Sequence, residues 1–412
     1  MTKSKLLIIG MVFPEPNSSG AGTRMLQLIR LFQEQGYHIT FASAASDSEF
    51  MFDLTTIKVE KINIKLNDSI FDEFVRKLNP DIVLFDRFVT EEQFGWRITE
   101  NCPDAIRILE TVDLHTLRLA RQKNSKENTN FKNQDLYSET AKREIACILR
   151  CDLSLIISEA EMDFLTTTFQ INPTLFYYLP FLVRKIDENV ISNWKKFEDR
   201  KDFIFIGNFL HEPNWDCVQY INLTIWPVLR KKLPDAKMLI YGAYPSAKVL
   251  QLHKPQENFF IMGRAENAFE VVENARVVLA PIRFGAGSKT KLLEAMQCGT
   301  PSVTTYVGAE AMHGKLKWNG VITDQANEII EAANTLYMVK NLWDDAQQSG
   351  IAIVNERFEK SLFEVLFAEK ISAVKENLRA HREQNFIGEI LKHHTLSSTK
   401  YLSRWIEEKN RK

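Results

Sequence analysis

Short apolar runs alternate with amphipathic segments along the first half of the chain. The runs are rich in branched residues and bounded by polar stretches, as buried strands are, and they cover residues 6–9, 38–42, 81–85, 105–109 and 153–157. Between the first two runs, apolar positions from Met25 to Phe32 form one helical stripe, which Gly36 ends as a C-terminal cap would. This alternation predicts a parallel sheet with helices on both faces.

The alternation stops near residue 183 and restarts after a charged segment. Further strands are expected at residues 203–206, 238–241, 258–261, 277–280 and 302–304, and helices around 215–223 and 226–233. We therefore predict an α/β protein of two Rossmann-like, doubly wound domains, residues 1–182 and 202–355, joined by a linker at 183–201. Their facing strand ends would form a ligand cleft. Residues 356–412 are expected to be helices, part of which pack back on the first domain.

One segment of the first domain lacks any periodic pattern. Residues 122–134 are polar and rich in Lys and Asn, which predicts an exposed loop.

Composition narrows the class of protein. The 412 residues are 45% hydrophobic and 25% charged with a formal net charge of −1, which fits a globular protein without a nucleic-acid signature. No apolar run approaches the roughly 20 residues that span a bilayer. The first run stops near Phe13 without a cleavage site, so a buried strand and a cytoplasmic location are expected. Cys147 and Cys151, two of five cysteines, are expected in a core rather than on a metal.

Candidate chemistry is concentrated in residues 281–301, PIRFGAGSKTKLLEAMQCGTP. An apolar strand at 277–280 enters a turn that contains Gly285 and Gly287, and a short helix follows. Such a strand–turn–helix unit directs free backbone N–H groups and a helix N-terminus at one spot, which suits phosphate. The segment therefore predicts a phosphate site.

Charged residues of this segment sharpen the prediction. Arg283, Lys289 and Lys291 add positive charge, and Glu294 can accept hydrogen bonds from sugar hydroxyls, which indicates a nucleotide-sugar diphosphate. On a helix Lys291 and Glu294 share a face, whereas Lys289 is about 200° away from Lys291. Lys289 can reach the same diphosphate only from the turn, with Ser288 as the candidate N-cap. Solvated surface charge is the alternative, and the glycine turn favours the site.

Two other strand exits carry candidate residues. Gly20 and Gly22 follow the first strand and permit close approach of the backbone to a ligand, although they do not form a dinucleotide fingerprint. A ligand contact is favoured over a flexible connection because such loops face the cleft. Asp113 and His115 follow a later strand, where a histidine can position or polarise an acceptor hydroxyl. A structural histidine fits that pattern equally well.

The motifs resemble those of a family, the retaining GT-B glycosyltransferases often called family 4 or glycosyl transferases group 1. The similarity is strongest from residue 203 to 312, where FIGN, HEPNW, WP, LPDA, YG, APIRFGAGSKTKLLEAM, CGTP and GAE stand in the family's order. The N-terminal half matches more loosely, through residues 19–24 and 36–40. The resemblance covers most of the chain.

The resemblance implies a donor site. Glu294 would bind the ribose hydroxyls, and Gly263 and Arg264 would lie beside the base. The catalytic candidates are His115, near the transferred sugar, and Lys291 and Arg283, on the leaving diphosphate. The other substrate-binding candidates surround the donor: Gly20, Gly22, Asp113, Asn208, Gly285, Gly287, Ser288 and Lys289.

Two positions depart from the family pattern. Ala286 stands where many members carry a glutamate that contacts the donor sugar, and Asn208 stands where many carry an arginine. The diphosphate cradle is therefore better preserved than the sugar pocket.

The implied activity is transfer of a hexose or related sugar from a nucleotide diphosphate sugar, the donor substrate, to an acceptor hydroxyl, with retention at the anomeric carbon. The acceptor would be a glycan, or a lipid-linked or protein-linked molecule, in glycan or glycoconjugate synthesis. No cofactor and no metal are expected, and no paired carboxylates indicate a glycoside hydrolase. Two alternatives stay open: a nucleotide-sugar 2-epimerase with the same fold, and an inactive sugar-nucleotide-binding partner protein.

The C-terminal residues have features relevant to membrane association. Residues 392–412 are basic and include Tyr401, Leu402 and Trp405, which is compatible with peripheral contact at the inner face of a membrane. A solvated terminal helix is the favoured interpretation.

Overall fold

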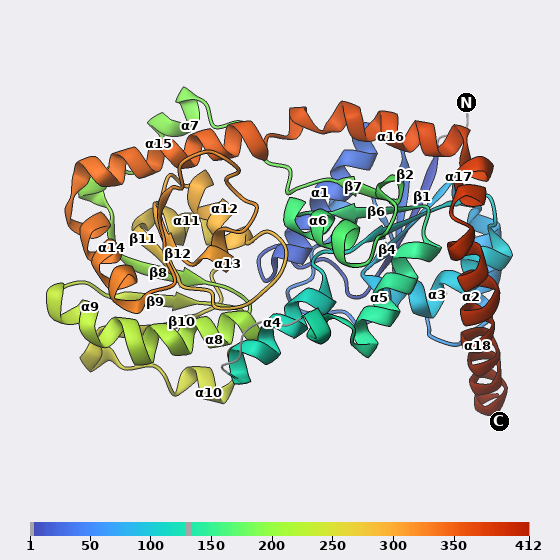
Figure 1. Ribbon diagram of the computed structural model, residues 1–412, viewed down its shortest axis with the longest axis horizontal. Coiled ribbons are helices and arrows are strands. Elements are labelled where there is room, and N and C mark those ends of the chain that lie inside the picture. Colours follow the sequence, from blue (N-terminus) through green and yellow to red (C-terminus); the bar gives the residue numbers. More distant parts are fainter. Residues whose placement is uncertain (1–3, 128–132, 412) are drawn as a thin grey trace.

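The computed structural model describes residues 4–127 and 133–411 and shows two α/β domains side by side (Figure 1). Each domain is built on one parallel sheet with helices on both faces. The doubly wound two-domain fold predicted from the sequence is therefore confirmed.

The N-terminal sheet has seven parallel strands in the order β3-β2-β1-β4-β5-β6-β7. They are β1 (Lys5–Gly10), β2 (His38–Ser43), β3 (Glu60–Asn63), β4 (Ile82–Asp86), β5 (Ile106–Glu110), β6 (Leu153–Ile156) and β7 (Phe176–Tyr178). The sequence pattern misses the two edge strands. Both are short, and β3 has no buried residue that would mark it as apolar.

Alternating side chains of these strands form two separate cores. Leu6 and Ile8 of β1 pack in the cluster that includes α1 (Gly20–Glu34), whereas Leu7 and Ile9 face the opposite cluster. The helices that pack in that second cluster are α2 (Ile70–Leu78), α3 (Phe88–Asn101), α4 (His115–Glu127), α5 (Glu139–Arg150) and α6 (Glu159–Thr168). Cys147 of α5 is fully buried there, as expected for a core residue.

The predicted loop at 122–134 is wrong in its first half. Helix α4 (His115–Glu127) continues through Glu127, because Ala120 and Asn124 are buried on one side of it. Residues 128–132 lie outside the described part of the chain, and a 3₁₀ turn follows at Asn133–Leu136. Gly36 ends α1 with φ +86°, as predicted.

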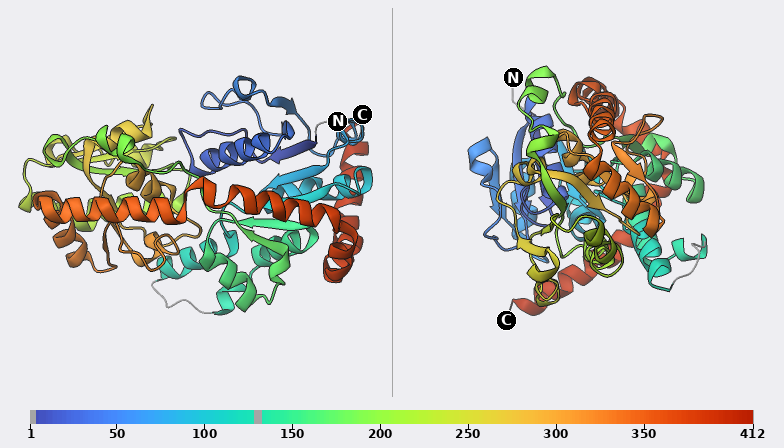
Figure 2. Two further views of the ribbon diagram at one scale, coloured as in Figure 1. Left: turned by 90° about the horizontal axis from the view of Figure 1, so that it is seen from above. Right: turned by 90° about the vertical axis from the view of Figure 1, so that its left-hand side faces the viewer.

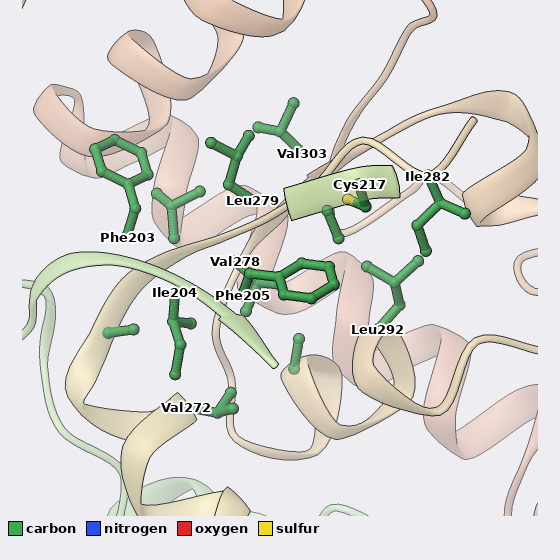
Figure 3. Packing of buried hydrophobic residues seen from close by; sticks show 14 of the residues in the cluster. Phe203, Ile204, Phe205, Cys217, Val272, Val278, Leu279, Ile282, Leu292 and Val303 are labelled. Carbon is green, nitrogen blue, oxygen red and sulfur yellow. The ribbon is translucent and has the colours of Figure 1, made fainter. Parts of the chain in front are cut away.

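The C-terminal sheet has six parallel strands in the order β10-β9-β8-β11-β12-β13. They are β8 (Lys201–Ile206), β9 (Met238–Tyr241), β10 (Phe259–Gly263), β11 (Ala275–Ala280), β12 (Ser302–Thr304) and β13 (Gly320–Ile322). The sequence pattern misses only the three-residue β13. In the core, Phe203 and Phe205 of β8 and Leu292 of α12 (Thr290–Gln297) are fully buried (Figure 3).

Short helices surround this sheet. They are α7 (Glu188–Ser192), α8 (Glu212–Tyr220), α9 (Trp226–Lys232), α10 (Ala247–Leu250), α11 (Ala268–Asn274), α13 (Tyr306–Ala309) and α14 (Ala326–Met338). A π-helical turn at Ile221–Ile225 joins α8 to α9.

The last helices return to the N-terminal domain. Helix α15 (Lys340–Arg357) covers the C-terminal domain, and α16 (Glu364–Glu376) continues in nearly the same line over the N-terminal one (Figures 1 and 2). There Phe367 meets the ring of Phe32 edge-on, with 5.4 Å between the ring centroids. Helix α17 (Leu378–Gln384) follows, and α18 (Phe386–Asn410) lies along α3 and α5.

Candidate active site

A cavity of about 540 Å³ lies between the two domains. Its walls are loops at the carboxyl ends of strands from both sheets, which is where doubly wound sheets bind ligands. The N-terminal domain contributes the exits of β1, β4, β5 and β6. The C-terminal domain contributes the exits of β8, β9, β10 and β11 and the start of α12. The predicted cleft between facing strand ends is present.

The connection from β11 to α12 forms one wall. Gly285 has φ +153° and Gly287 has φ +64°, which favours glycine at both positions. The prediction that Ser288 caps α12 is wrong, because Lys289 occupies the N-cap position. The hydroxyl of Ser288 instead donates to the carbonyl of Ile157 in the other domain, at 3.0 Å.

Two lysines lie against this wall. Lys289 belongs to the turn, as its spacing from Lys291 requires, and its Nζ donates to the carbonyl of Gly287 at 2.6 Å. Lys291 donates from Nζ to Oδ1 of Asn214 in α8 at 2.7 Å. Burial lowers the pKa of Lys289 to about 8 and lowers the pKa of Lys291 as well. An anion in the cavity would therefore stabilise the charged form of both.

Glu294 follows Lys291 by three residues on α12 and lines the same cavity. Burial raises the pKa of its carboxyl to about 7, against the opposing charge of Lys291. The carboxyl is thus poised to exchange its proton near neutral pH.

Buried carboxylates hold the start of α4. His115 was expected in the loop after the strand, but it is the first residue of this helix. The amides of His115 and Thr116 donate to Glu144 at 2.9 Å each, and the amide of Leu114 donates to Glu161 at 2.8 Å. Nδ1 of His115 lies 3.4 Å from Oε1 of Glu144. The backbone contacts fix the start of α4 at the cavity wall, and His115 lines the cavity from there.

A charged cluster lies beside His115. Arg118 donates from Nε to Oδ2 of Asp113 at 2.7 Å, and the backbone just before Asp113 is strained, because Val112 has φ +63°. Although burial raises the pKa of Asp113, Arg118 and the neighbouring histidines hold it below its usual value. The surroundings of His211, which lines the cavity from the other domain, lower its pKa to about 4 by desolvation. His211 is therefore neutral near pH 7.

The two domains touch at the start of α1. A Cβ atom on Gly20 would lie 2.0 Å from Oγ1 of Thr290, so only glycine allows this approach. Nδ2 of Asn208 donates to the carbonyl of Ser18 at 3.1 Å across the same boundary.

The structure brings most predicted site residues to one cavity. Those that line it are Gly20, Asp113, His115, Asn208, Arg264, Gly285, Ser288, Lys289, Lys291 and Glu294. Gly22, Gly263, Gly287 and Arg283 are not in its lining. Gly22 instead lets the backbone of α1 pack closely against Glu15, since a Cβ atom there would lie 2.4 Å from the carbonyl carbon of Glu15.

Arg283 turns away from the cavity. Its neighbours Ile282 and Phe284 are buried and line the cavity, whereas Arg283 is exposed and is not part of the lining. Its Nε donates to Oδ2 of Asp216 at 2.9 Å, and its guanidinium lies over the ring of Tyr220. The structure therefore does not support contact between Arg283 and a diphosphate in the cavity.

A metal site is not evident in the described residues, because no group of three or more His, Cys, Asp or Glu side chains comes together there. No helix described is long and apolar enough to cross a membrane.

Comparison with known proteins identifies the C-terminal domain. Residues 200–338 match the family model for glycosyl transferases group 1. This domain belongs to the glycosyl transferases group 1 family. This match confirms the resemblance seen in the sequence. A separate search of curated protein sequences finds no match.

Solved glycosyltransferase structures share the whole GT-B fold. S. aureus TarM, in complex with fondaparinux, α-GlcNAc-glycerol and UDP, is 10% identical with a TM-score of 0.69 over 90% of this chain and 99% of that chain. HepE from Anabaena, in complex with UDP and glucose, is 15% identical with a TM-score of 0.66 over 90% and 100% of the chains. Sucrose-phosphate synthase from Thermosynechococcus elongatus is 12% identical, with a TM-score of 0.66 over 90% and 99%. At these identities the likeness shows the fold.

Sequence reasoning missed several polar residues in and beside this cavity. Asn214 and His211 belong to the HEPNW motif, which was a usable signal for both. Arg87 and Arg118 line the N-terminal wall, and no family motif marks them. Arg121 of α4 reaches the glycine turn across the domain boundary, a contact that no local pattern reveals.

Proposed function

We propose that the protein transfers a sugar from a nucleotide diphosphate sugar to an acceptor hydroxyl, with retention at the anomeric carbon. The observation that carries the proposal is the arrangement of Lys289, Lys291 and Glu294 around one interdomain cavity, on a domain of the glycosyl transferases group 1 family. UDP is bound in the TarM and HepE structures, which makes UDP sugars the first donors to test.

The two lysines would act on the leaving diphosphate. Negative charge grows on that group as the bond to the sugar breaks, so preorganised cations lower the barrier. Asn214 already orients Nζ of Lys291, and Lys289 is held at the glycine turn. Because burial penalises both charges, their interaction with the diphosphate is stronger than it would be in water.

Glu294 and Arg264 would hold the nucleoside. In the ionised form Glu294 accepts hydrogen bonds from ribose hydroxyls, and Arg264 would lie beside the base at the exit of β10. On the N-terminal wall, His115 would face the transferred sugar, with its backbone held by Glu144. Closed domains would also keep water from the donor.

Ala286 explains how the sugar side departs from the family pattern. Its methyl group packs in the hydrophobic cluster of the N-terminal domain and is 7% exposed. A glutamate at this position would lose much of its hydration. Polar contacts to the sugar would therefore come from Asp113 and His115 on the opposite wall.

Calorimetric titration with UDP, followed by turnover assays with UDP sugars and acceptor mixtures, tests the proposal. Lys291→Ala and Glu294→Ala should each weaken UDP binding at least tenfold, about 1.4 kcal/mol. Arg283→Ala is the matched control, because this cation lies in the same segment but outside the cavity lining. Near wild-type turnover in both cavity variants would overturn the assignment. Conversion of the donor sugar without any acceptor would instead indicate an epimerase.

A further inference from the structure

Arg87 has an unusual backbone conformation at the cavity. It directly follows β4 and is the N-cap of α3, with φ +70° and ψ 159°. This region of conformational space is occupied almost only by glycine, and other residues persist there at a cost in stability, mostly at functional sites. A glycine would fit the turn without strain, so the backbone alone does not explain an arginine.

The guanidinium of Arg87 has little to bind inside the protein. Nη1 lies 3.5 Å from Oδ2 of Asp86 and 3.2 Å from Sδ of Met11. The same Asp86 oxygen already accepts the amide of Met11 at 3.2 Å. Among the described residues, Nε and Nη2 of Arg87 have no hydrogen-bond partner. A cation with unused donors therefore lines the cavity.

A second guanidinium lies on the same wall. Arg118 uses Nε on Asp113, which leaves its two terminal nitrogens without a hydrogen-bond partner in the described residues. The exits of β4 and β5 are adjacent, because Asp86 pairs with Glu110 in the sheet. The rings of Phe88 and His115 also meet, with 5.2 Å between centroids.

The charge around the cavity exceeds what the donor requires. Its lining contains five basic side chains of Lys and Arg and two carboxylates: Arg87, Arg118, Arg264, Lys289 and Lys291 against Asp113 and Glu294. In the proposed function the lysines serve the diphosphate, and Asp113 neutralises Arg118 in part. Arg87 remains, on the wall opposite the donor loop.

We infer that Arg87, supported by Arg118, binds an oxyanion on the acceptor, so the accepting molecule carries a phosphate or a carboxylate near its reacting hydroxyl. The inference rests on the proposed function, because it assigns the N-terminal wall to the acceptor. Arginine suits this role since its planar donors can bind either oxyanion in bidentate fashion.

Chemical-shift titration of the UDP-saturated protein tests the inference with matched probes. Glycerol 3-phosphate is compared with glycerol, and methyl glucuronide with methyl glucoside, so the two pairs separate phosphate from carboxylate. At least one anionic probe should bind ten times or more tightly than its neutral partner. Arg87→Gln should reduce that ratio to about one. Arg379→Gln removes an exposed charge on α17 and should leave the ratio unchanged.

Each result decides a different question. Equal binding of both members in both pairs, or an unchanged preference in Arg87→Gln, overturns the inference. Failure of the wild-type protein to bind UDP overturns the proposed function instead. Arg87→Gly supplies a second readout, because relief of the strained backbone should keep or raise the melting temperature while the preference for anions disappears. A lower melting temperature in Arg87→Gly would show that the arginine serves the fold.

Discussion

Arg121 and Glu310 form a two-pronged ion pair across the domain boundary. Nη1 and Nη2 of Arg121, on α4, lie 2.7 and 2.6 Å from the two carboxylate oxygens of Glu310 in the C-terminal domain. Nη1 also donates to the carbonyl of Gly285 at 2.8 Å. One side chain of the N-terminal domain therefore holds the glycine turn that carries Lys289.

Arg121→Gln should weaken UDP binding about three- to tenfold, because the glycine turn loses its anchor in the other domain. A tenfold loss corresponds to about 1.4 kcal/mol. Lys126→Gln is a suitable control, since Lys126 lies on the same helix and its exposed contact with Glu212 is 3.9 Å long. Equal UDP affinities for the two variants, measured by calorimetry, would show that the Arg121 contact does not support the turn.

Asn214→Ala should lower kcat about tenfold or more with a smaller effect on protein stability. Oδ1 of Asn214 orients the Lys291 ammonium, and Nδ2 donates to the carbonyl of Asn208 at 2.7 Å. Without this side chain the ammonium is less well positioned for charge that develops in the transition state. Steady-state kinetics and a melting curve on the same preparation separate the two effects, and an unchanged kcat would contradict the role assigned to Asn214.

UDP affinity should pass through a maximum between about pH 7 and pH 8. Glu294, with a pKa raised to about 7, must lose its proton to act as an ionised acceptor, so affinity falls as the pH decreases below this value. Lys289, with a pKa lowered to about 8, loses its charge as the pH rises above that value. In Glu294→Gln, the fall in UDP affinity at low pH that comes from protonation of this carboxylate (the acid limb) should disappear. If the acid limb is the same in Glu294→Gln, it comes from the nucleotide alone.

Arg382→Ala should destabilise the fold by about 3 kcal/mol, because it leaves the buried carboxylate of Asp152 with one partner fewer. Arg382 of α17 donates from Nε and Nη2 to the two oxygens of Asp152, both at 2.8 Å. Arg379→Ala is the matched control, since that side chain is 94% exposed and pairs with Glu383 one turn further on the same helix. Urea unfolding near pH 7 measures both variants, and similar midpoints would contradict this contribution of Arg382.

The same carboxylate predicts acid sensitivity. Although burial raises the pKa of Asp152, Arg107 and Arg382 lower it well below the usual range. A depressed pKa contributes stability above the unfolded-state value of about 3.9, and this contribution is lost as the pH falls through the folded-state pKa. The wild-type protein should therefore lose stability below about pH 4, and Arg382→Ala should lose less over the same range. Parallel pH profiles of the two proteins would contradict this linkage.

The fold and most of the donor wall could be predicted because their signals are local. Apolar runs, glycine turns and the spacing of Lys289, Lys291 and Glu294 follow directly from neighbouring residues. Three short strands were missed because they show no buried apolar pattern. β3 and β13 have no buried residue and β7 has one, whereas the three-residue β12, which was predicted, is buried throughout.

The rest of the site depends on contacts between distant parts of the chain. Ser288 does not cap α12, and its hydroxyl instead donates to the carbonyl of Ile157, 131 residues earlier. Arg283 donates to Asp216, which lies 67 residues earlier in the chain, and is not part of the cavity lining. Arg87 and Arg118 of the N-terminal domain belong to no family motif, and only the cavity lining reveals them.

The path of α15 and α16 across both domains has a consequence for biosynthesis. Translation produces the N-terminal sheet first, yet α16, which covers Phe32 and its neighbours, is made only after the entire C-terminal domain. The earliest domain to leave the ribosome is therefore the last to be completed. Until then the apolar surface of α1 and β7 that α16 covers stays exposed, which makes it a natural target for chaperones.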